Sequence, residues 1–175
     1  LAIEKGIPTQ VSFFSTKAAK TALRETGPAT LVSATNCFAH IENIHDIIEG
    51  ILTLLVDDGV FVSENHYLIS LIDTLQYDTI YHEHLRYYSL AALSHLLGMH
   101  GLEPIHVKRI PTHGGSFRTY AARKGTRPVQ PSVGKIFEME KSRGPMTKQL
   151  LRFRDKTAAS KLALYAMIHD IKEKG

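Results

Sequence analysis

The sequence predicts an α/β fold: a mostly parallel sheet that ends in an antiparallel pair and continues into a helical arm. Two observations support this prediction. Between Thr9 and Glu64, apolar runs of strand length alternate with segments of helical periodicity, which is typical of βαβ units with right-handed crossovers. Later in the chain, two strand-like runs are separated only by Pro111–Gly115, and the Gly-Gly pair within this segment favours a hairpin or bulge.

The first part of the chain contains the alternating elements. β-branched and aromatic residues indicate strands, serine is a favourable helix cap, and apolar residues at helical spacing indicate a buried helix face. Asp57-Asp58-Gly59 predicts a turn between a helix and the next strand. We expect, in order, a strand at Thr9–Phe14, a helix from Ser15 to Gly27, a strand at Ala29–Asn36, a helix at Ile44–Leu55 and a strand at Val60–Glu64.

The second part is less regular. Pro and Gly mark its turns, and apolar residues from Leu150 to Ile171 recur along one helical face. We expect helices at Tyr67–Leu75 and Ser89–Gly98, strands at Leu102–Ile110 and Ser116–Arg123, and a helical arm from Val133. The predicted organisation is therefore a domain over residues 1–125, a linker over 126–132 and an arm over 133–175.

Composition excludes several classes of protein. Apolar residues make up 43% of the chain and charged residues 22%, which argues against a disordered chain. The lone Cys37 has no intrachain partner for a disulfide, so we expect a reducing, cytoplasmic setting. Acidic residues interrupt the longest apolar run, which argues against a membrane span. Residues 135–174 hold 10 Lys and Arg against 5 Asp and Glu, and these charges alternate with apolar residues as on a solvated helix face. No aromatic pattern there suggests base stacking, so we do not expect nucleic-acid binding.

Polar residues follow two of the predicted strands. In open α/β sheets, ligands bind beyond the carboxyl ends of the strands, and Asn36–His40 and Glu64–Tyr67 stand at such ends. Each set of residues also has a purely structural interpretation, as a strand end or a helix cap. None of the twelve glycines forms G-x-G, so the chain lacks a phosphate cradle of that type.

Histidine is the residue that most suggests chemistry, since ten are present and two lie in Tyr81-His82-Glu83-His84. Histidine exchanges protons near neutral pH, and a neighbouring Tyr or Glu can orient it. Hydrogen-bonded structural histidines are the alternative explanation. A metal-dependent enzyme using His82 and His84 is another, although the HExxH spacing and a cysteine companion are both missing.

Four motifs in order resemble one family. TNCFAH at 35–40, DDGVFV at 57–62, YDTIYHEH at 77–84 and HGGSFR at 113–118 are similar to motifs of the S-adenosylmethionine-dependent sugar C-methyltransferases. That resemblance extends over about residues 7–125 and implies a partial Rossmann-like methyltransferase sheet. It also implies S-adenosylmethionine as cofactor and a nucleotide-linked keto-deoxysugar as substrate. The chain departs from the family at residues 63–66, where SENH replaces a more apolar strand end.

The resemblance also implies roles for individual residues. His84 is the expected base that removes a proton alpha to a ketone, because methylation at carbon requires an enolate. Tyr81 and His40 would hold or polarise the keto sugar, and Glu83 would orient the base or bind the sugar. The expected cofactor-binding residues are Asn36 and Cys37, and the expected substrate-binding residues are Asn65, Tyr67, His113, Gly115 and Ser116.

The chain begins at Leu1 and ends at Gly175 within a helical pattern, so we expect a piece of a longer polypeptide. The family has an amino-terminal zinc module and a glycine-rich cofactor loop, both absent from these residues. The resemblance therefore implies zinc only in a missing module, no metal in this chain, and a fragment that is inactive alone. A non-catalytic methyltransferase-like module is the alternative. The sugar, its nucleotide and the oligomeric state are left open.

Overall fold

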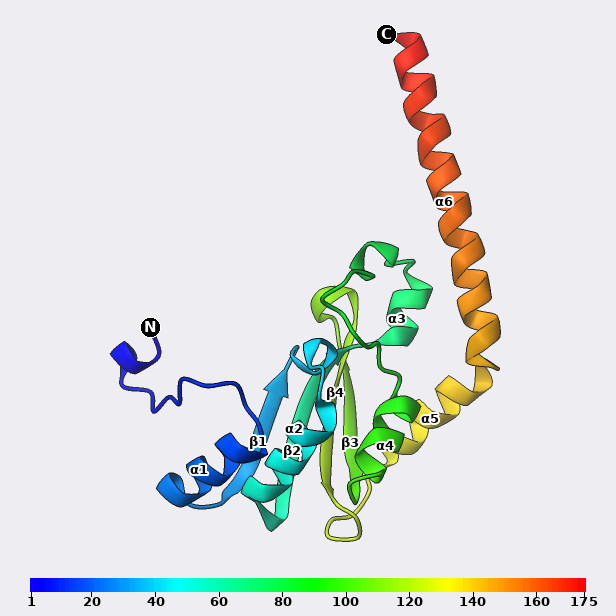
Figure 1. Cartoon of the computed structure of the whole chain (residues 1–175). Coiled ribbons are helices and arrows are strands. Elements are labelled where there is room, and N and C mark those ends of the chain that lie inside the picture. Colours follow the sequence, from blue (N-terminus) through cyan, green and yellow to red (C-terminus); the bar gives the residue numbers. More distant parts are fainter.

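The computed structural model describes residues 1–175 and contains one four-stranded mixed sheet with the strand order β1-β2-β4-β3 (Figure 1). The strands are β1 (Ala29–Thr35), β2 (Leu55–His66), β3 (Leu102–Ile110) and β4 (Ser116–Arg123). The α-helices are α1 (Thr16–Thr26), α2 (Ile44–Leu54), α3 (Leu68–Asp73), α4 (Leu90–Gly98), α5 (Pro131–Ser142) and α6 (Met146–Lys174). The predicted α/β fold is therefore confirmed.

The order of the strands follows from their connections. β1 and β2 are parallel, with Thr35 opposite Glu64, and α2 forms the crossover between them. β4 then inserts between β2 and β3 and is antiparallel to both, with Ser116 opposite His66. This arrangement places the carboxyl ends of β1 and β2 next to the β3–β4 turn, which is where the polar motifs lie.

One core cluster joins the helices to the sheet. α2, α4 and α5 pack on one face of the sheet, and α1 packs against α2 (Figure 1). The predicted serine caps are present, since Ser15 Oγ accepts from Ala18 N and Ser89 Oγ accepts from Ala92 N, both at 3.1 Å. The largest fully buried side chains of this cluster come from both the helical side and the sheet. They include Phe38, Ile48, Ile51, Phe61, Leu93, Leu97 and Phe117.

The prediction of a strand at Thr9–Phe14 is wrong. A strand needs a hydrogen-bonded neighbour, but the backbone of this segment makes only a local bond, from Ser12 N to Gln10 O. Val11 and Phe13 are almost fully exposed, at 86% and 98%. The segment has the β-branched and aromatic composition that is typical of a strand, but it lies apart from the sheet edge in Figure 1.

Two boundaries also differ from the prediction. Asp57-Asp58-Gly59 does not form a turn, because β2 begins at Leu55 and the pairing with β1 absorbs the extra residues as a register shift. The predicted helical arm is present and consists of two helices, α5 and α6. It breaks between α5 and α6 at Gly144, which has a positive φ of 78°, and at Pro145.

Helix α5 is packed into the domain rather than extended from it. Val133 is buried in the main core, and Ser132 Oγ lies 2.7 Å from His106 Nδ1 on β3. Glu140 accepts three hydrogen bonds, from Leu90 N at 2.6 Å and Ala91 N at 3.0 Å at the start of α4, and from the Tyr67 hydroxyl at 2.8 Å. Its carboxylate thus ties α5 to α4 and to the end of β2.

Most of helix α6 has no partner in this chain. Phe153 is buried against Leu71 and Ile72 of α3, but beyond it the apolar face is exposed, with Leu164 at 48% and Ile171 at 62%. Figure 1 shows the helix standing away from the sheet. None of the helices, α6 included, combines the length and the apolar character required to cross a bilayer.

Candidate active site

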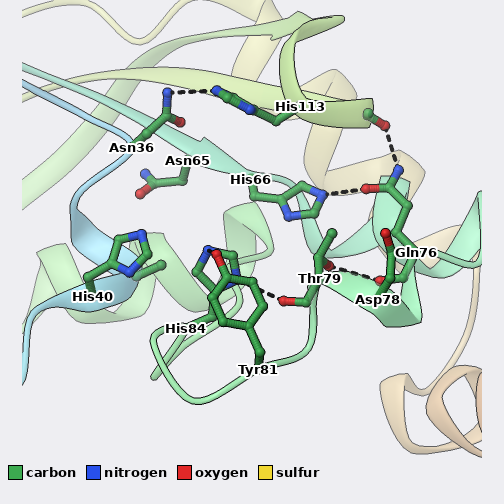
Figure 2. A pocket seen from close by; sticks show the side chains of 12 residues that line it. Asn36, His40, Asn65, His66, Gln76, Asp78, Thr79, Tyr81, His84 and His113 are labelled. Atoms are coloured by element: carbon green, nitrogen blue, oxygen red, sulfur yellow. Dashed lines mark hydrogen bonds between the residues drawn. The ribbon is translucent and has the colours of Figure 1, made fainter.

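A cavity of about 530 Å³ lies at the carboxyl ends of β1 and β2 (Figure 2). This is the edge where ligands bind in open α/β sheets. Four separate parts of the chain form its walls. The lining residues are Asn36, Ala39, His40, Asn65, His66, Gln76, Asp78, Thr79, Tyr81, His84, His113 and Gly114.

His84 has the geometry of a base. Its Nδ1 lies 2.8 Å from the carbonyl oxygen of Thr79, and because a carbonyl can only accept, Nδ1 carries the proton and donates it. In the neutral ring the lone pair is then at Nε2, which lies 3.5 Å from the Tyr81 hydroxyl. The ring centroids lie 4.4 Å apart with the planes tilted by 45°, so Tyr81 and His84 form one unit in the cavity wall.

His40 lies beside this unit, with its ring centroid 4.8 Å from that of His84. Its Nδ1 donates to the backbone oxygen of Glu83 at 2.9 Å, which leaves Nε2 as the acceptor in the neutral ring. The YHEH segment therefore positions His40 through a main-chain atom. The side chain of Glu83 itself is exposed and does not line the cavity.

The opposite end of the cavity is formed by the end of β1 and the β3–β4 turn. Asn36 and His113 both have positive φ angles, 53° and 52°, which are uncommon for residues with a side chain. The Asn36 amide nitrogen lies 3.3 Å from His113 Nε2, so the turn and the strand end are connected directly. Figure 2 shows this pair across the top of the cavity.

Asn65 has an unusual environment for a buried amide. It is only 2% exposed, and neither its Oδ1 nor its Nδ2 has a hydrogen-bond partner in the protein. Burying an amide without partners costs about 1–3 kcal/mol. Asn65 is among the residues that line the cavity, although both polar atoms of its amide are buried.

An ion pair between buried Glu64 and partly exposed Arg118 supports the β3–β4 turn. Glu64 accepts from Arg118 Nε at 3.0 Å and Nη2 at 2.7 Å, and from the hydroxyl of Thr112 at 3.3 Å. The hydrogen bonding between Arg118 and Glu64 is the main reason that the pKa of the Arg118 guanidinium is raised. Glu64 is therefore not a solvated strand end but a structural link between β2 and the turn that carries His113.

Gly115 makes a close approach that a side chain would block. Its φ is 120°, and a Cβ there would lie 2.6 Å from Cβ and Oγ of Ser70. We expect Gly115→Ala to lower the free energy of unfolding by about 1–3 kcal/mol, measured by urea denaturation.

The matched control for this glycine is Gly134→Ala. Gly134 is inside α5 with open space around it, so alanine should stabilise the protein by about 0.5–1 kcal/mol. The interpretation of Gly115 would be contradicted if both substitutions changed stability in the same direction.

The structure brings together Asn36, His40, Asn65, Tyr81, His84 and His113 among the predicted site residues. It places others outside the cavity. Tyr67 is fully buried and donates its hydroxyl to Glu140, and burial together with that bond raises its pKa. Ser116 is buried and donates to Thr112 O at 3.1 Å.

Four polar lining residues, His66, Gln76, Asp78 and Thr79, had no role assigned from the sequence. His66 lies within the predicted strand end Glu64–Tyr67, and Asp78 and Thr79 lie within the YDTIYHEH motif. The position of His66 at a strand's carboxyl end was the available signal. Gln76, Asp78 and Thr79 lie around a short 3-10 turn, Tyr77–Thr79, whose proximity to β2 has no local signature. No three His, Cys, Asp or Glu side chains anywhere in the chain are grouped to hold a metal ion, and His82 does not line the cavity.

A second, apolar cavity of about 300 Å³ adjoins the end of β1, with Cys37, Val32 and Ile47 among its lining residues. Burial raises the pKa of the Cys37 thiol, which favours an unreactive apolar side chain over a nucleophile. The amide of Asn36 lies on the polar side of this strand end. The apolar cavity and the neighbouring Asn36 amide together fit a ligand that has both an apolar and a polar part, as S-adenosylmethionine has.

The chain matches two protein families. Residues 4–107 match the family described as "Methyltransferase domain", and residues 111–175 match the one described as "C-methyltransferase C-terminal domain". The first match alone covers more than half of the chain, so the chain belongs to the methyltransferase-domain family.

One relative indicates which kind of methyltransferase the chain is similar to. The chain is 37% identical over 145 residues to "C-methyltransferase NovU" of Streptomyces niveus. The alignment covers 82% of this chain and 34% of that protein, so the chain spans about a third of the length of its relative.

Proposed function

We propose that the protein C-methylates a nucleotide-linked keto-deoxysugar, with His84 as the base that removes the proton alpha to the ketone. The observation that carries this proposal is the donation from His84 Nδ1 to the Thr79 carbonyl, which directs a basic Nε2 toward the Tyr81 hydroxyl at the cavity. A fixed tautomer keeps the lone pair at the atom that must approach the substrate. A small-molecule substrate also fits the size of the cavity.

Tyr81 and His40 differ in what they can offer the ketone. The Tyr81 hydroxyl carries one proton, which can turn from His84 Nε2, 3.5 Å away, to a developing enolate oxygen. The Nδ1 proton of His40 is already donated to Glu83 O, so its Nε2 donates only when the ring is doubly protonated. We therefore assign the polarising role to Tyr81 and a substrate-holding role to His40 and His113.

S-adenosylmethionine, when bound, would supply an electrophilic methyl group to the enolate carbon. We place Asn36 and the apolar cavity beside Cys37 on the side of the site that would hold it. Holding both partners at one sheet edge would supply much of the acceleration through proximity. We propose further that the sugar is nucleotide-linked and that the protein acts in the cytoplasm.

Asn65 supplies a test of the substrate site. We expect Asn65→Leu to raise the free energy of unfolding by about 1 kcal/mol, because it removes an unpartnered buried amide while preserving apolar volume. The same change should weaken sugar binding by about tenfold or more. Urea denaturation and isothermal titration calorimetry measure the two effects.

The control for this variant is Asn43→Leu. Asn43 caps α2 by accepting from Asp46 N at 3.3 Å, so its loss should destabilise the protein by about 1 kcal/mol. Destabilisation by Asn65→Leu comparable with that of Asn43→Leu would mean that Asn65 has a structural partner, and the substrate role would be withdrawn.

The function itself is tested with the full-length protein. It is incubated with S-adenosylmethionine and a thymidine-diphosphate keto-deoxyhexose, and mass spectrometry follows transfer of one methyl group to a sugar carbon. In heavy water without a methyl donor, deuterium should enter the position alpha to the ketone. Titration of S-adenosylmethionine measures cofactor binding separately. Absence of methyl transfer, exchange and cofactor binding would favour the non-catalytic module.

A further inference from the structure

His66 is a cavity residue to which the proposed mechanism assigns no role. It is the last residue of β2, its side chain is half-buried, and it lines the same cavity as His84 and Asn65. Its Nε2 lies 2.9 Å from Oε1 of Gln76. The question is which of its two ring nitrogens carries the proton, since that decides what His66 can offer a ligand.

The surroundings of Gln76 answer this question. The amide nitrogen of Gln76 donates to Gly114 O at 2.9 Å and also to the hydroxyl of Thr74, so the other end of the amide is the oxygen. An amide oxygen can only accept, and His66 Nε2 must therefore donate to it. In the neutral ring this leaves Nδ1 as a lone pair. Figure 2 shows this second nitrogen turned away from Gln76 toward the cavity.

Burial and the neighbouring histidines favour the neutral form of the His66 ring. Burial lowers its pKa most, and His84 and His113 lower it further, while the hydrogen bond to Gln76 and the charge of Asp78 act in the opposite direction. The net pKa lies below the ordinary value for histidine. The Nδ1 lone pair thus persists at pH values at which an exposed histidine is already protonated.

We propose that His66 is a specificity-determining residue whose Nδ1 accepts a hydrogen bond from a hydroxyl or ammonium group of the sugar. The proposal rests on the proposed function for the identity of the ligand, but the tautomer of His66 does not depend on it. Asn65, its neighbour, lines the same cavity and has a buried amide without a partner in the protein. Two adjacent β2 residues would then recognise the polar substituents of the sugar, while Tyr81 and His84 act on its ketone.

The first measurement uses the 175-residue chain and needs no activity. Histidine ring nitrogens are followed by 15N-detected NMR, first alone and then during titration with a thymidine-diphosphate keto-deoxyhexose that has a free hydroxyl beside its carbonyl. We expect His66 to show a protonated Nε2 and an unprotonated Nδ1, and the Nδ1 signal to shift on addition of the sugar. The same sugar O-methylated at that hydroxyl should leave Nδ1 unchanged. An amino analogue that shifts Nδ1 more strongly would identify an ammonium as the preferred donor.

The second measurement uses variants of the full-length protein. His66→Phe removes the acceptor, and we expect it to lower kcat/KM for the hydroxyl sugar by about 10- to 100-fold, and for the O-methyl sugar by less than about threefold. His66→Asn places an amide oxygen near the Nδ1 position and should restore most of the preference. It is also the variant to use if phenylalanine impairs folding.

The outcomes separate this inference from the proposed function. An Nδ1 that is protonated, or that responds to neither the hydroxyl nor the amino sugar, overturns the role of His66. Equal losses for both sugars in His66→Phe do so as well, even if methylation itself is confirmed. An Nδ1 response without any methyl transfer by the wild-type protein supports the role of His66 and rejects the proposed reaction.

Discussion

Replacing His84 with alanine is expected to lower the rate of C-methylation by about 10²- to 10⁴-fold, the usual contribution of a positioned general base. The reason is the loss of Nε2. Its lone pair faces the Tyr81 hydroxyl because Nδ1 carries the proton and donates it to the Thr79 carbonyl. The affinity for S-adenosylmethionine should remain nearly unchanged, because we place the cofactor beside Asn36 and Cys37. Product formation by mass spectrometry and calorimetric titration of the cofactor measure the two quantities.

His82→Ala is the matched control for this experiment. His82 belongs to the same segment, is exposed, and contacts only the edge of the Tyr81 ring, with centroids 6.2 Å apart. Its replacement should change the rate by less than about tenfold. Deuterium exchange alpha to the ketone should disappear in His84→Ala and persist in His82→Ala. Retained methylation in His84→Ala would reject His84 as the base.

Replacing Glu140 with alanine is expected to lower the free energy of unfolding by about 3 kcal/mol. The carboxylate accepts from two backbone amides at the first turn of α4, where a negative charge is also stabilised by the helix dipole. It accepts as well from the hydroxyl of the fully buried Tyr67, which alanine would leave unpaired. Urea denaturation followed by circular dichroism measures the change.

Two further variants show whether the hydrogen bonds are responsible. Glu138 lies on the same helix at an exposed position. Glu138→Ala should therefore change the free energy of unfolding by no more than about 0.5 kcal/mol. Tyr67→Phe removes one of the three bonds and should cost about 1 kcal/mol. If Glu140→Ala were no more destabilising than Glu138→Ala, α5 would have to be held on α4 by apolar packing alone.

The local sequence was sufficient for most individual elements. The helices beginning after Ser15 and Ser89 start where their caps indicate, because a cap is a contact between residues three positions apart. The antiparallel end of the sheet could be predicted for a similar reason, since Leu102–Ile110 and Ser116–Arg123 are joined by a short turn. The general rule for open sheets also pointed to the ends of β1 and β2, where polar residues line one cavity.

Long-range contacts explain the errors. Thr9–Phe14 has the composition of a strand, but a strand also requires a neighbouring edge, which composition does not report. Tyr67 has the same aromatic, polar character as Tyr81. Only the tertiary structure shows that its hydroxyl is used by Glu140, 73 residues later, whereas Tyr81 lies in the cavity wall.

The sequence by itself determined the α/β class, the position of the YHEH histidines and the resemblance to sugar C-methyltransferases, because these depend on local periodicity and on residue order. The tertiary structure alone decided which polar side chains share one cavity. The Gly114–Gln76–His66 chain joins three segments that are distant in sequence, and its hydrogen bonds set the proton position on His66. That proton position depends on which atoms meet, and no pattern along the chain encodes it.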